Sequence, residues 1–455
     1  MGGGGILCTG QEMCYPPTHM HENLRVSKLI NGLEEALEKV PEYREGKNIR
    51  YELVDAGMAA FAVFFVQSPS FLAAQREMKG RKGRSNAEKL FGLREIPSDN
   101  QIRNLLDPLE PSWVGGEYWR LLQAMEEGKL LDKFRSYEGQ LLVLLDGTEY
   151  FSSKKIQCEN CSQRELQDGK LNYYHSVLTP VVAQPGNGHV IALEPEFIVP
   201  QDGQEKQDCE IQAGKRWIKK HGKKLVKLGV TILGDDLYSR QPYCQALKDE
   251  GLHFILVCKR ESHEYLYTTL DYLAAQGVLG TKVVRKWNGK YGEIHTYRYA
   301  NQLSLRKEQP AMQVNWCEWT VRREDTGELL YRNAFITDFE VKETNVEAIT
   351  LDGRTRWKIE NENNNVLKTK GYHIEHNFGH GQQHLASFLL SLNLLAFLMH
   401  TLLELVDEKY QAIRQALGRR RTFFQHLEAL LYYICFDSWD DVLQFMFQGL
   451  ELDTG

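Results

Sequence analysis

The sequence predicts a mixed α/β (α+β) protein in which helical regions flank a central run of strands. Three changes of pattern along the chain support this prediction. Residues 1–137 have mostly helical character, residues 138–261 alternate apolar strands with helices, and residues 262–348 are polar, aromatic and β-leaning. Helical character returns over residues 349–455. At 455 residues the chain is also too long for one compact core, so several domains are expected.

Composition and cysteine usage indicate a globular protein of a reducing compartment. Charged residues make up 25% of the chain, an ordinary share for a soluble protein. Nine scattered cysteines do not form a disulfide framework. Residues 1–13 lack the basic and apolar parts of a signal peptide, and the Ser or Thr of a myristoylation signal. Four polar residues interrupt the apolar run Leu385–Val406, so we expect a buried helix there rather than a membrane span.

The net charge of −6 gives no sign of a nucleic-acid partner, but the cations are clustered. Basic clusters stand at Lys79–Arg84, Lys215–Lys224 and Arg419–Arg421, and local patches rather than totals set the affinity for phosphates. The second cluster lies on a predicted amphipathic helix, at about residues 208–228. Its candidate DNA-binding residues are Lys215, Arg216, Lys219 and Lys220.

Two capping-box signatures lie in the N-terminal helical region, at Ser85–Glu88 and Ser98–Gln101. Each opens a short predicted helix, which ends at Phe91 and Leu106 respectively, and the basic run Lys79–Arg84 precedes both. Two short capped helices behind a basic loop are typical of a DNA-binding helical unit. A small helical bundle with a solvated loop fits the same pattern, so both interpretations stay open.

From Gly139 onward strands and helices alternate in a specific order. The predicted elements are the strands Leu141–Leu145, Leu171–Gln184 and His189–Val199, the basic helix, the strand Val230–Leu233, the helix Pro242–Glu250 and the strand His253–Cys258. Three strands, helix, strand, helix, strand is the order of a ribonuclease-H-like sheet. We therefore predict a ribonuclease-H-like catalytic core that residues 262–348 interrupt as a β-rich insertion.

Two of these strands run into an acid. Asp146 follows the first strand, and Asp235 follows Gly234 after the fourth. Carboxylates at one sheet edge suit phosphodiester chemistry, because two Mg²⁺ ions must bridge the attacking and leaving oxygens and Mg²⁺ takes hard oxygen ligands. The pair alone is weak evidence, since such residues often cap the next helix.

A third acid lies on a later predicted helix. Arg356, Glu360 and Asn364 are spaced i, i+4 and i+8, which puts them on one helical face. A carboxylate between a cation and an amide suits metal and phosphate binding. The same spacing suits an ion-pair ladder on the surface, and periodicity alone favours that interpretation.

Three motifs follow one another in the chain: Asp146–Tyr150 (DGTEY), Leu233–Pro242 (LGDDLYSRQP), and Arg356–Glu360 (RWKIE) with Gly371–Gly381 (GYHIEHNFGHG). Together they resemble bacterial insertion-sequence transposases of the DDE class, in the group with a β-strand insertion between the second Asp and the Glu. The resemblance covers about residues 50–405. Three motifs in the correct order are much more specific than any one of them.

The resemblance implies that Asp146, Asp235 and Glu360 are catalytic carboxylates that ligate Mg²⁺, for which Mn²⁺ can substitute. Asp236 is the alternative to Asp235, which we prefer because the family spaces its acid three residues before a tyrosine, here Tyr238. The implied activity is binding of the terminal inverted repeats of an insertion sequence, with cleavage and transfer of double-stranded DNA by a homodimer. The implied location is the bacterial cytoplasm, at the nucleoid. A non-catalytic DNA-binding descendant and a ribonuclease-H-like nuclease without strand transfer stay open as alternatives.

The family signature Tyr-x₂-Arg-x₃-Glu-x₆-Lys is not fully kept. Gly353 stands at the tyrosine position and Leu367 at the lysine position, with Lys368 one residue later. On an α-helix this displacement turns the side chain by about 100°. The family's phosphate-binding role therefore passes to Lys368 only with that rotation, and its tyrosine role has no occupant.

Cys158 and Cys161 have the spacing of a zinc knuckle, with His175 and His189 downstream as partners. A single CxxC is a weak signal, so two ordinary loop thiols are the favoured interpretation and structural Zn²⁺ is the alternative. Glycines interrupt the histidines of residues 376–384, so we expect a loop that contacts the DNA backbone there rather than a metal site.

Trp287, Trp316 and Trp319 lie in the predicted insertion. Core packing is the default role of tryptophan. Trp287 stands beside an Asn-Gly turn with Arg285 and Lys290 nearby, which makes it the best placed to stack on a displaced base, as an insertion-domain aromatic does in similar transposases.

Overall fold

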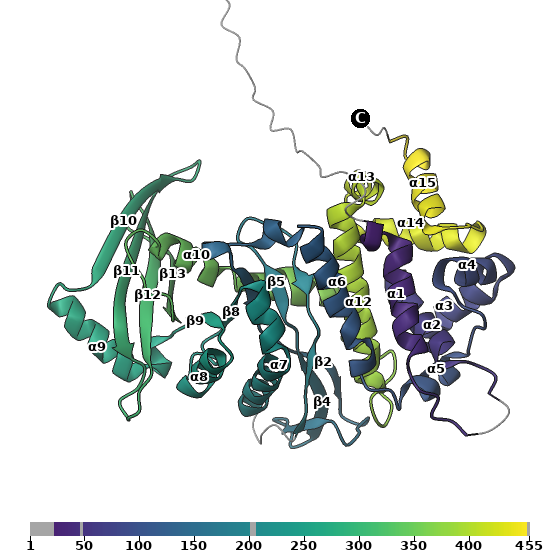
Figure 1. Ribbon diagram of the computed structural model, residues 1–455, viewed down its shortest axis with the longest axis horizontal. Helices are drawn as coiled ribbons and strands as arrows, with labels where there is room; N and C mark the ends of the chain where they lie inside the picture. Colours follow the sequence, from purple (N-terminus) through teal and green to yellow (C-terminus); the bar gives the residue numbers. More distant parts are fainter. Residues whose placement is uncertain (1–21, 46–48, 201–205, 453–455) are drawn as a thin grey trace, which may run out of the picture.

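A nine-stranded mixed sheet runs through the middle of the molecule (Figure 1). The computed structural model describes residues 22–45, 49–200 and 206–452. The strand order in this sheet is β10-β11-β12-β13-β9-β8-β1-β5-β6. The expectations about a signal peptide and myristoylation concern residues 1–13, which lie outside the described residues.

The last five strands of that order form the predicted core. They are β9 (His253–Val257), β8 (Val230–Gly234), β1 (Leu141–Leu144), β5 (Val181–Ala183) and β6 (Ile191–Ala192). β1 pairs in parallel with β8 and antiparallel with β5, and β9 is parallel to β8. Helix α7 (Lys206–Leu228) precedes β8, and α8 (Gln241–Asp249) joins β8 to β9. The mixed α/β fold class and the ribonuclease-H-like order of its core are confirmed.

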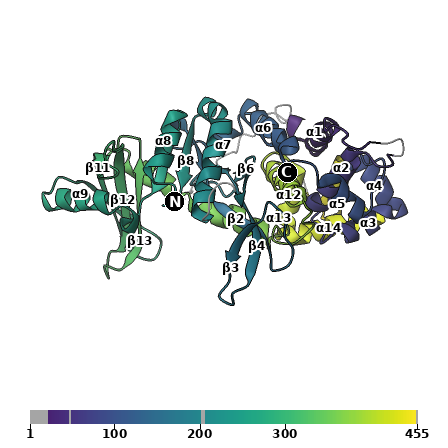
Figure 2. The same ribbon diagram turned by 90° about the horizontal axis from the view of Figure 1, so that it is seen from below.

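A second, smaller sheet continues the three antiparallel strands of the core. It consists of β2 (Gly147–Ser153), β3 (Ser162–Glu165), β4 (Leu171–Leu178) and β7 (Glu196–Ile198). Asp146 lies between β1 and β2, and Pro180 lies between β4 and β5, where its missing N–H suits a break in pairing. The predicted long strands Leu171–Gln184 and His189–Val199 are therefore each two shorter strands. Figure 2 shows β3 and β4 projecting from the body of the molecule.

The insertion extends the core sheet. Its strands are β10 (Gly280–Trp287), β11 (Gly292–Ser304), β12 (Gln313–Arg323) and β13 (Leu329–Thr337), and β13 pairs antiparallel with β9. A helix that the β-rich prediction missed, α9 (Glu264–Ala275), precedes them. Its tyrosines and threonines favour strands in isolation. Its buried residues Leu266, Tyr267 and Leu270 follow a helical spacing, and tertiary packing decides the outcome.

Helices from both ends of the chain share one core at the other end of the molecule (Figure 1). The N-terminal ones are α1 (Val26–Glu38), α2 (Leu53–Phe65), α3 (Phe71–Lys79), α4 (Arg81–Phe91), α5 (Asp99–Leu106) and α6 (Ser112–Glu127). The C-terminal ones are α12 (Leu385–Val406), α13 (Glu408–Leu417), α14 (Arg420–Tyr433) and α15 (Trp439–Gly449). Contacts join α12 to α2 and α14 to α4.

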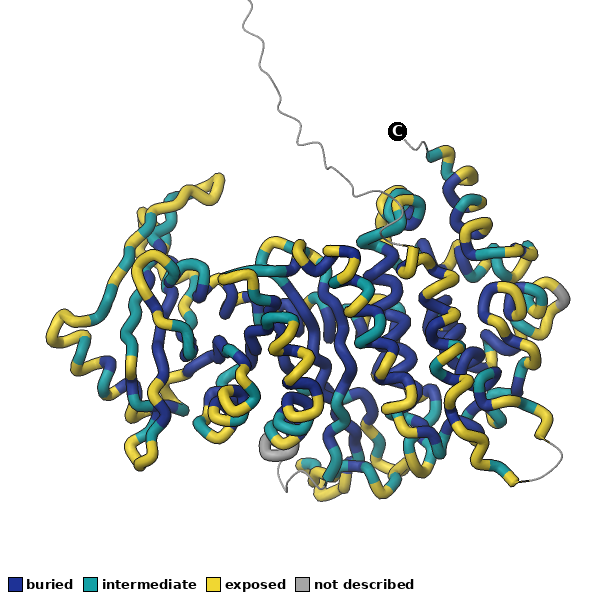
Figure 3. The backbone as a smooth tube through the Cα atoms, viewed as in Figure 1, coloured by how far each residue is buried: buried dark blue, intermediate teal, exposed yellow. Residues whose placement is uncertain are grey.

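Helix α12 is the apolar segment that resembled a membrane span. It is long and apolar enough to cross a membrane, but 83% of its most apolar window is buried inside the protein. Figure 3 shows it buried along most of its length, like the central strands. α12 is therefore a core helix, as expected.

The two predicted capping boxes have different outcomes. Ser98 accepts a hydrogen bond from the Gln101 backbone and caps α5, which confirms the second box. The first prediction was wrong, because α4 begins at Arg81 and includes Ser85 in its interior. Arg and Lys are good helix formers, so the basic run ends α3 and opens α4 with only Gly80 between them. The expected basic loop is thus largely helical.

Candidate active site

Asp146 and Asp235 stand at the same level of the core sheet. Leu144 of β1 is paired with Leu233 of the neighbouring parallel strand β8. Each aspartate follows that pair by two residues. Neighbouring strands lie about 4.8 Å apart, so the chain turns both acids out at one edge of the sheet, as the sequence predicted.

Burial and neighbouring carboxylates perturb Asp146. Its pKa is raised from 3.8 to about 7, first because burial penalises the charged form and second because the Glu210 carboxylate lies nearby. Asp235 and Glu360 raise the pKa further, while the Arg356 guanidinium lowers it. The electrostatic surroundings of Asp146 therefore include both other predicted acids and one more.

Glu210 is the residue that sequence reasoning missed. It lies on α7 with 8% of its surface exposed, and a β-carbon on Gly147 would come within 2.5 Å of its Oε2. The Tyr238 hydroxyl donates a hydrogen bond to its Oε1 at 2.8 Å. The available signal was its position on the same helical face as the buried Trp217, which the more prominent pattern of cations on this helix obscured.

The helix that carries Glu360 reaches Asp146 through Asn364. Helix α10 (Val346–Arg354) is followed by a π-helical turn η6 (Ile359–Asn364) and by α11 (Asn365–Thr369). Asn364 Nδ2 donates to Asp146 Oδ2 at 2.9 Å. The Glu360 side chain is 51% exposed and accepts a hydrogen bond from Arg356 Nη2 at 2.5 Å. The predicted face therefore serves both interpretations, because it contains an ion pair and also contacts the strand-end acid.

The π turn changes how the displaced lysine is placed. A π turn bonds residues i and i+5, so it holds one more residue than an α turn. Lys368, eight residues after Glu360, therefore takes about the angular position that the seventh residue has on a regular α-helix. Leu367, at the family's lysine position, is fully buried, and Lys368 pairs with Glu375 at 2.8 Å. The extra residue of the π turn acts against the one-residue shift in the sequence, and the phosphate-binding role of Lys368 stays a prediction.

Gly353 occupies its position for a packing reason. It lies in α10, which contacts β9 and β13. A β-carbon there would lie 2.7 Å from the Phe335 ring and 3.0 Å from Ile255 Cγ2. A tyrosine does not fit at this position.

Asp236 points to a different neighbourhood from Asp235. Its Oδ1 accepts hydrogen bonds from the Lys259 backbone at 2.6 Å and from Ser262 Oγ at 2.7 Å. Asp235 Oδ1 accepts from the Leu237 backbone at 2.8 Å. Because Asp236 caps the turn after β9, the geometry favours Asp235 as the acid of the site.

Two cations of the basic helix are held by the protein itself. Arg216 Nε lies 3.0 Å from Glu196 Oε1, and Lys220 Nζ lies 2.6 Å from Glu194 Oε1. Lys219 is exposed and Lys215 is half-buried. The DNA-binding role of these four residues stays a prediction. To bind DNA, Arg216 and Lys220 would have to exchange their carboxylate partners for phosphates.

The tryptophans of the insertion differ in burial. Trp316 and Trp319 are 1% and 5% exposed and belong to the core. Trp287, at the end of β10, is 70% exposed. Its side chain is thus accessible for stacking.

The cysteine pair lies in a cluster that the sequence only partly predicted. Cys158 and Cys161 contact His175, but His189 lies elsewhere, 3.5 Å from Glu404. His380 joins the cysteines instead and is buried, which corrects the expectation that no metal-binding cluster forms at this loop. DNA contact by the rest of the loop stays a prediction. The loop containing His380 folds inward because its imidazole finds buried sulfur and nitrogen partners there.

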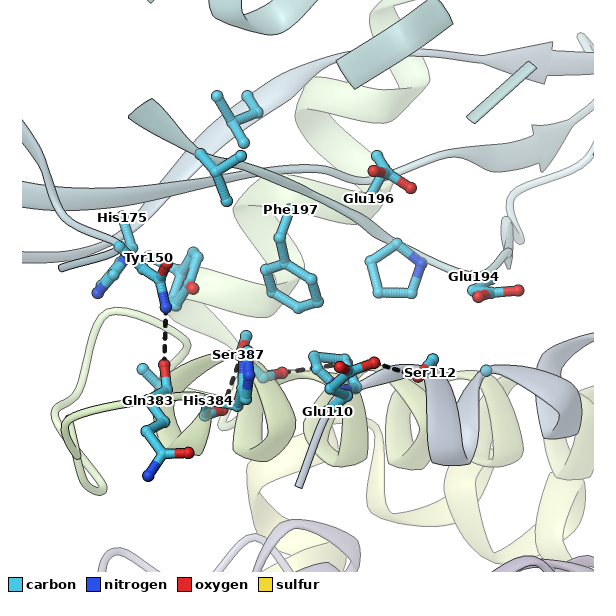
Figure 4. Close-up of a pocket in the computed structure, with 18 of the residues that line it drawn as sticks. Glu110, Ser112, Tyr150, His175, Glu194, Glu196, Phe197, Gln383, His384 and Ser387 are labelled. Atoms are coloured by element: carbon cyan, nitrogen blue, oxygen red, sulfur yellow. Dashed lines mark hydrogen bonds between the residues drawn. The ribbon is translucent and has the colours of Figure 1, made fainter. Parts of the chain in front are cut away.

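A separate pocket opens between β7 and the first turns of α12 (Figure 4). Phe197 points into it, with Tyr150 and His175 toward one end and Glu194 at the other. None of the three predicted acids is among the described residues that line it. The candidate active site is therefore the sheet edge at Asp146 and not this pocket.

No protein-family model matches the chain, and no curated protein matches its sequence. Among solved structures, the chain is similar to the piggyBac transposase in a synaptic complex with hairpin DNA. The two are 11% identical, the match covers 98% of this chain and 84% of that one, and the TM-score is 0.38. A likeness at this level identifies no family.

Proposed function

We propose that the protein is a DDE transposase that cleaves and joins DNA with Mg²⁺ at Asp146, Asp235 and Glu360. One observation carries the proposal: two acids stand level on adjacent parallel strands, and the helix of the third acid hydrogen-bonds to the first through Asn364. A surface ion-pair ladder would not explain that contact.

The residues at this edge fit a divalent cation of the Mg²⁺ class. All the candidate donors are carboxylate oxygens, which are the hard ligands that Mg²⁺ prefers. Burial first and the neighbouring carboxylates second raise the pKa of Asp146 to about 7, and a cation among these carboxylates would lower it. Mg²⁺, when bound, would stabilise the charge on the attacking and leaving oxygens. Mn²⁺ prefers the same oxygen ligands and can substitute for it.

Other side chains of the site position the catalytic carboxylates and neutralise phosphate charge in this proposal. Asn364 fixes the orientation of the Asp146 carboxylate, and Arg356 orients Glu360. Lys368, half-buried on the same helical segment, exchanges Glu375 for a DNA phosphate. These groups supply positioning and charge stabilisation, so the enzyme needs no covalent intermediate.

The DNA surface extends from the site toward the insertion. Trp287 is exposed for stacking on a displaced base, and the cations on α7 contact the backbone of the terminal repeats. The enzyme acts on both ends of its element as a homodimer, at the bacterial nucleoid.

A cleavage assay tests the proposal. The purified protein is mixed with Mg²⁺ and with DNA that carries the sequences flanking its gene. We expect cleavage that Asp235→Asn abolishes without loss of DNA binding, while the matched control Asp236→Asn keeps it. Binding without cleavage would identify a non-catalytic DNA-binding protein. Cleavage without joining of a pre-cut end would identify a nuclease.

A further inference from the structure

Four side chains with metal-binding atoms meet away from the candidate active site. The ligand atoms of Cys158, Cys161, His175 and His380 all lie within 4.8 Å of one another. The two cysteines come from the β2–β3 connection, His175 from β4 and His380 from the loop before α12. Cys161 and His380 are 219 residues apart in the chain, so tertiary folding brings the four together.

Five of the six distances between these atoms are close to the edges of a zinc tetrahedron, and the sixth, Cys158 to His380, is within 4.8 Å. Zn–S bonds of about 2.3 Å and Zn–N bonds of about 2.05 Å require edges of about 3.8 Å for S–S, 3.5 Å for S–N and 3.3 Å for N–N. The two sulfurs are 3.8 Å apart. The three closest sulfur–nitrogen pairs measure 3.5, 3.4 and 3.4 Å. The two Nε2 atoms are 3.1 Å apart.

Both imidazoles turn Nε2 toward the cysteine sulfurs and also bond to the backbone. His380 Nδ1 donates to the Gly381 carbonyl at 2.8 Å, and His175 bonds to the backbone of Asn160. A neutral imidazole carries one proton, so Nε2 of His380, whose Nδ1 is the donor, presents a lone pair to the centre. The Nε2 atom of His175 lies 3.1 Å from it, close to the N–N edge of a zinc tetrahedron. Backbone bonds of this kind are also what fixes metal-ligating histidines in orientation.

The turn around the cysteines has the form of a knuckle. The Cys158 backbone N–H donates to Cys161 Sγ at 3.4 Å, and the Cys161 N–H donates to the Cys158 carbonyl at 3.2 Å. The Asn160 side chain donates to the Gln383 carbonyl at 3.0 Å, which ties the turn to the loop of His380. Three of the four ligands are buried and the fourth is half-buried, so the centre is shielded from water.

We propose that Cys158, Cys161, His175 and His380 bind one structural zinc ion. Four protein ligands of types S₂N₂ close the coordination sphere, which is the pattern of structural rather than catalytic zinc. The ion would join the second sheet to the loop that connects the Glu360 helix with α12. It would thereby hold two parts of the candidate active site, the strands beyond Asp146 and the segment beyond Asn364, in fixed relation. The zinc site stands independently of the proposed transposase activity.

Metal analysis of the purified full-length protein tests the site. We expect elemental mass spectrometry to find about one equivalent of zinc per chain. The zinc should remain after dialysis and be released when the thiols are modified. Cobalt(II) substitution should give the intense absorption of a tetrahedral thiolate site. Zinc-free protein from zinc-supplemented expression, or an oxidised Cys158–Cys161 pair in freshly prepared protein, would overturn the proposal.

Variants locate the zinc. Cys161→Ser and His380→Ala should lose it, whereas His376→Ala, an exposed histidine of the same loop, should keep it. His380→Cys replaces one zinc ligand by another and should retain the metal, which keeps the test valid if the alanine variant fails to fold. Asp146→Asn should also retain its full zinc content. Loss of zinc from Asp146→Asn alone would place the metal at the carboxylate site and refute this assignment.

Discussion

Mg²⁺ binding at the candidate active site should depend on pH through Asp146. The pKa of this carboxyl is raised from 3.8 to about 7 by burial first and by the Glu210 carboxylate second. A raised pKa keeps the neutral form up to neutrality, and Mg²⁺ must displace that proton before Asp146 can act as a ligand. Binding should therefore be weak on the acid side, strengthen as pH rises through 7, and change little above about pH 8.

The magnitude follows from the size of the shift. At about pH 6 roughly nine in ten molecules carry the proton, and each pH unit below the pKa costs about 1.4 kcal/mol, or about tenfold in apparent affinity. An aspartate at its ordinary pKa would give no change over the same range. Removing one neighbouring charge by Glu210→Gln should move the midpoint to lower pH, because that carboxylate is a cause of the shift.

Calorimetric titration with Mg²⁺ in two buffers of different ionisation enthalpy measures both effects. We expect nearly one proton released per site at about pH 6 and almost none at about pH 8. Equal affinity at both pH values with no proton release would refute the reasoning. A midpoint unchanged in Glu210→Gln would remove that carboxylate from the site.

Three further predictions concern single side chains. Glu404→Gln should lower the free energy of unfolding by up to about 3 kcal/mol, because it leaves the half-buried Arg414 and Arg420 without their carboxylate partner, whereas the exposed Glu375→Gln should change it little. Burial alone would raise the pKa of Glu404, but the hydrogen bond with His189 and the charges of the two arginines outweigh burial and lower the pKa to about 2. The ionised Glu404 therefore stabilises the folded state above the unfolded pKa near 4.5, and this contribution is lost as pH falls toward 2. Trp287→Ala should preserve the melting temperature and raise the activation free energy of cleavage by about 1–3 kcal/mol, because the exposed indole would no longer stack on a base. The control Trp316→Ala, at a buried tryptophan, should lower the melting temperature. A lower melting temperature with unchanged cleavage in Trp287→Ala would show that Trp287 is structural. Tyr238→Phe should lower the free energy of unfolding by about 1.5–3 kcal/mol, because it removes a hydrogen bond to the buried Glu210 carboxylate. Denaturant unfolding measures this change, and an unchanged free energy would contradict the prediction.

The sequence predicted those parts of the fold that local pattern determines. The alternation of strands and helices yields the core order, and the two strand-end acids follow from apolar runs that stop at Asp146 and Gly234. α9 was missed because tyrosines and threonines favour strands locally, while burial of one face decides for a helix. The break at Pro180 was missed because the apolar run continues on both sides of it.

The parts of the site that remained unpredicted depend on contacts between distant segments. Glu210 meets Gly147 only because α7 packs across the second sheet, and no spacing rule links the two. His380 reaches Cys161 across 219 residues. The π turn has no signature in single-residue propensities, so the sequence could not predict the extra residue between Glu360 and Lys368.

The pairing of β13 with β9 has a mechanical consequence. Because the insertion shares main-chain hydrogen bonds with the sheet that carries Asp235, it cannot swing on a hinge, and the tip of the β10–β11 hairpin is held at a fixed reach. A strand advances about 3.4 Å per residue, nearly the same as one nucleotide along a DNA strand. The length of the hairpin therefore determines how far Trp287 lies from the core sheet. Removing two residues from each strand keeps the side chains on the same faces and shortens this reach by a distance of about two nucleotides. In the proposed DNA complex, the length of the hairpin rather than its flexibility would set which nucleotide the Trp287 indole meets.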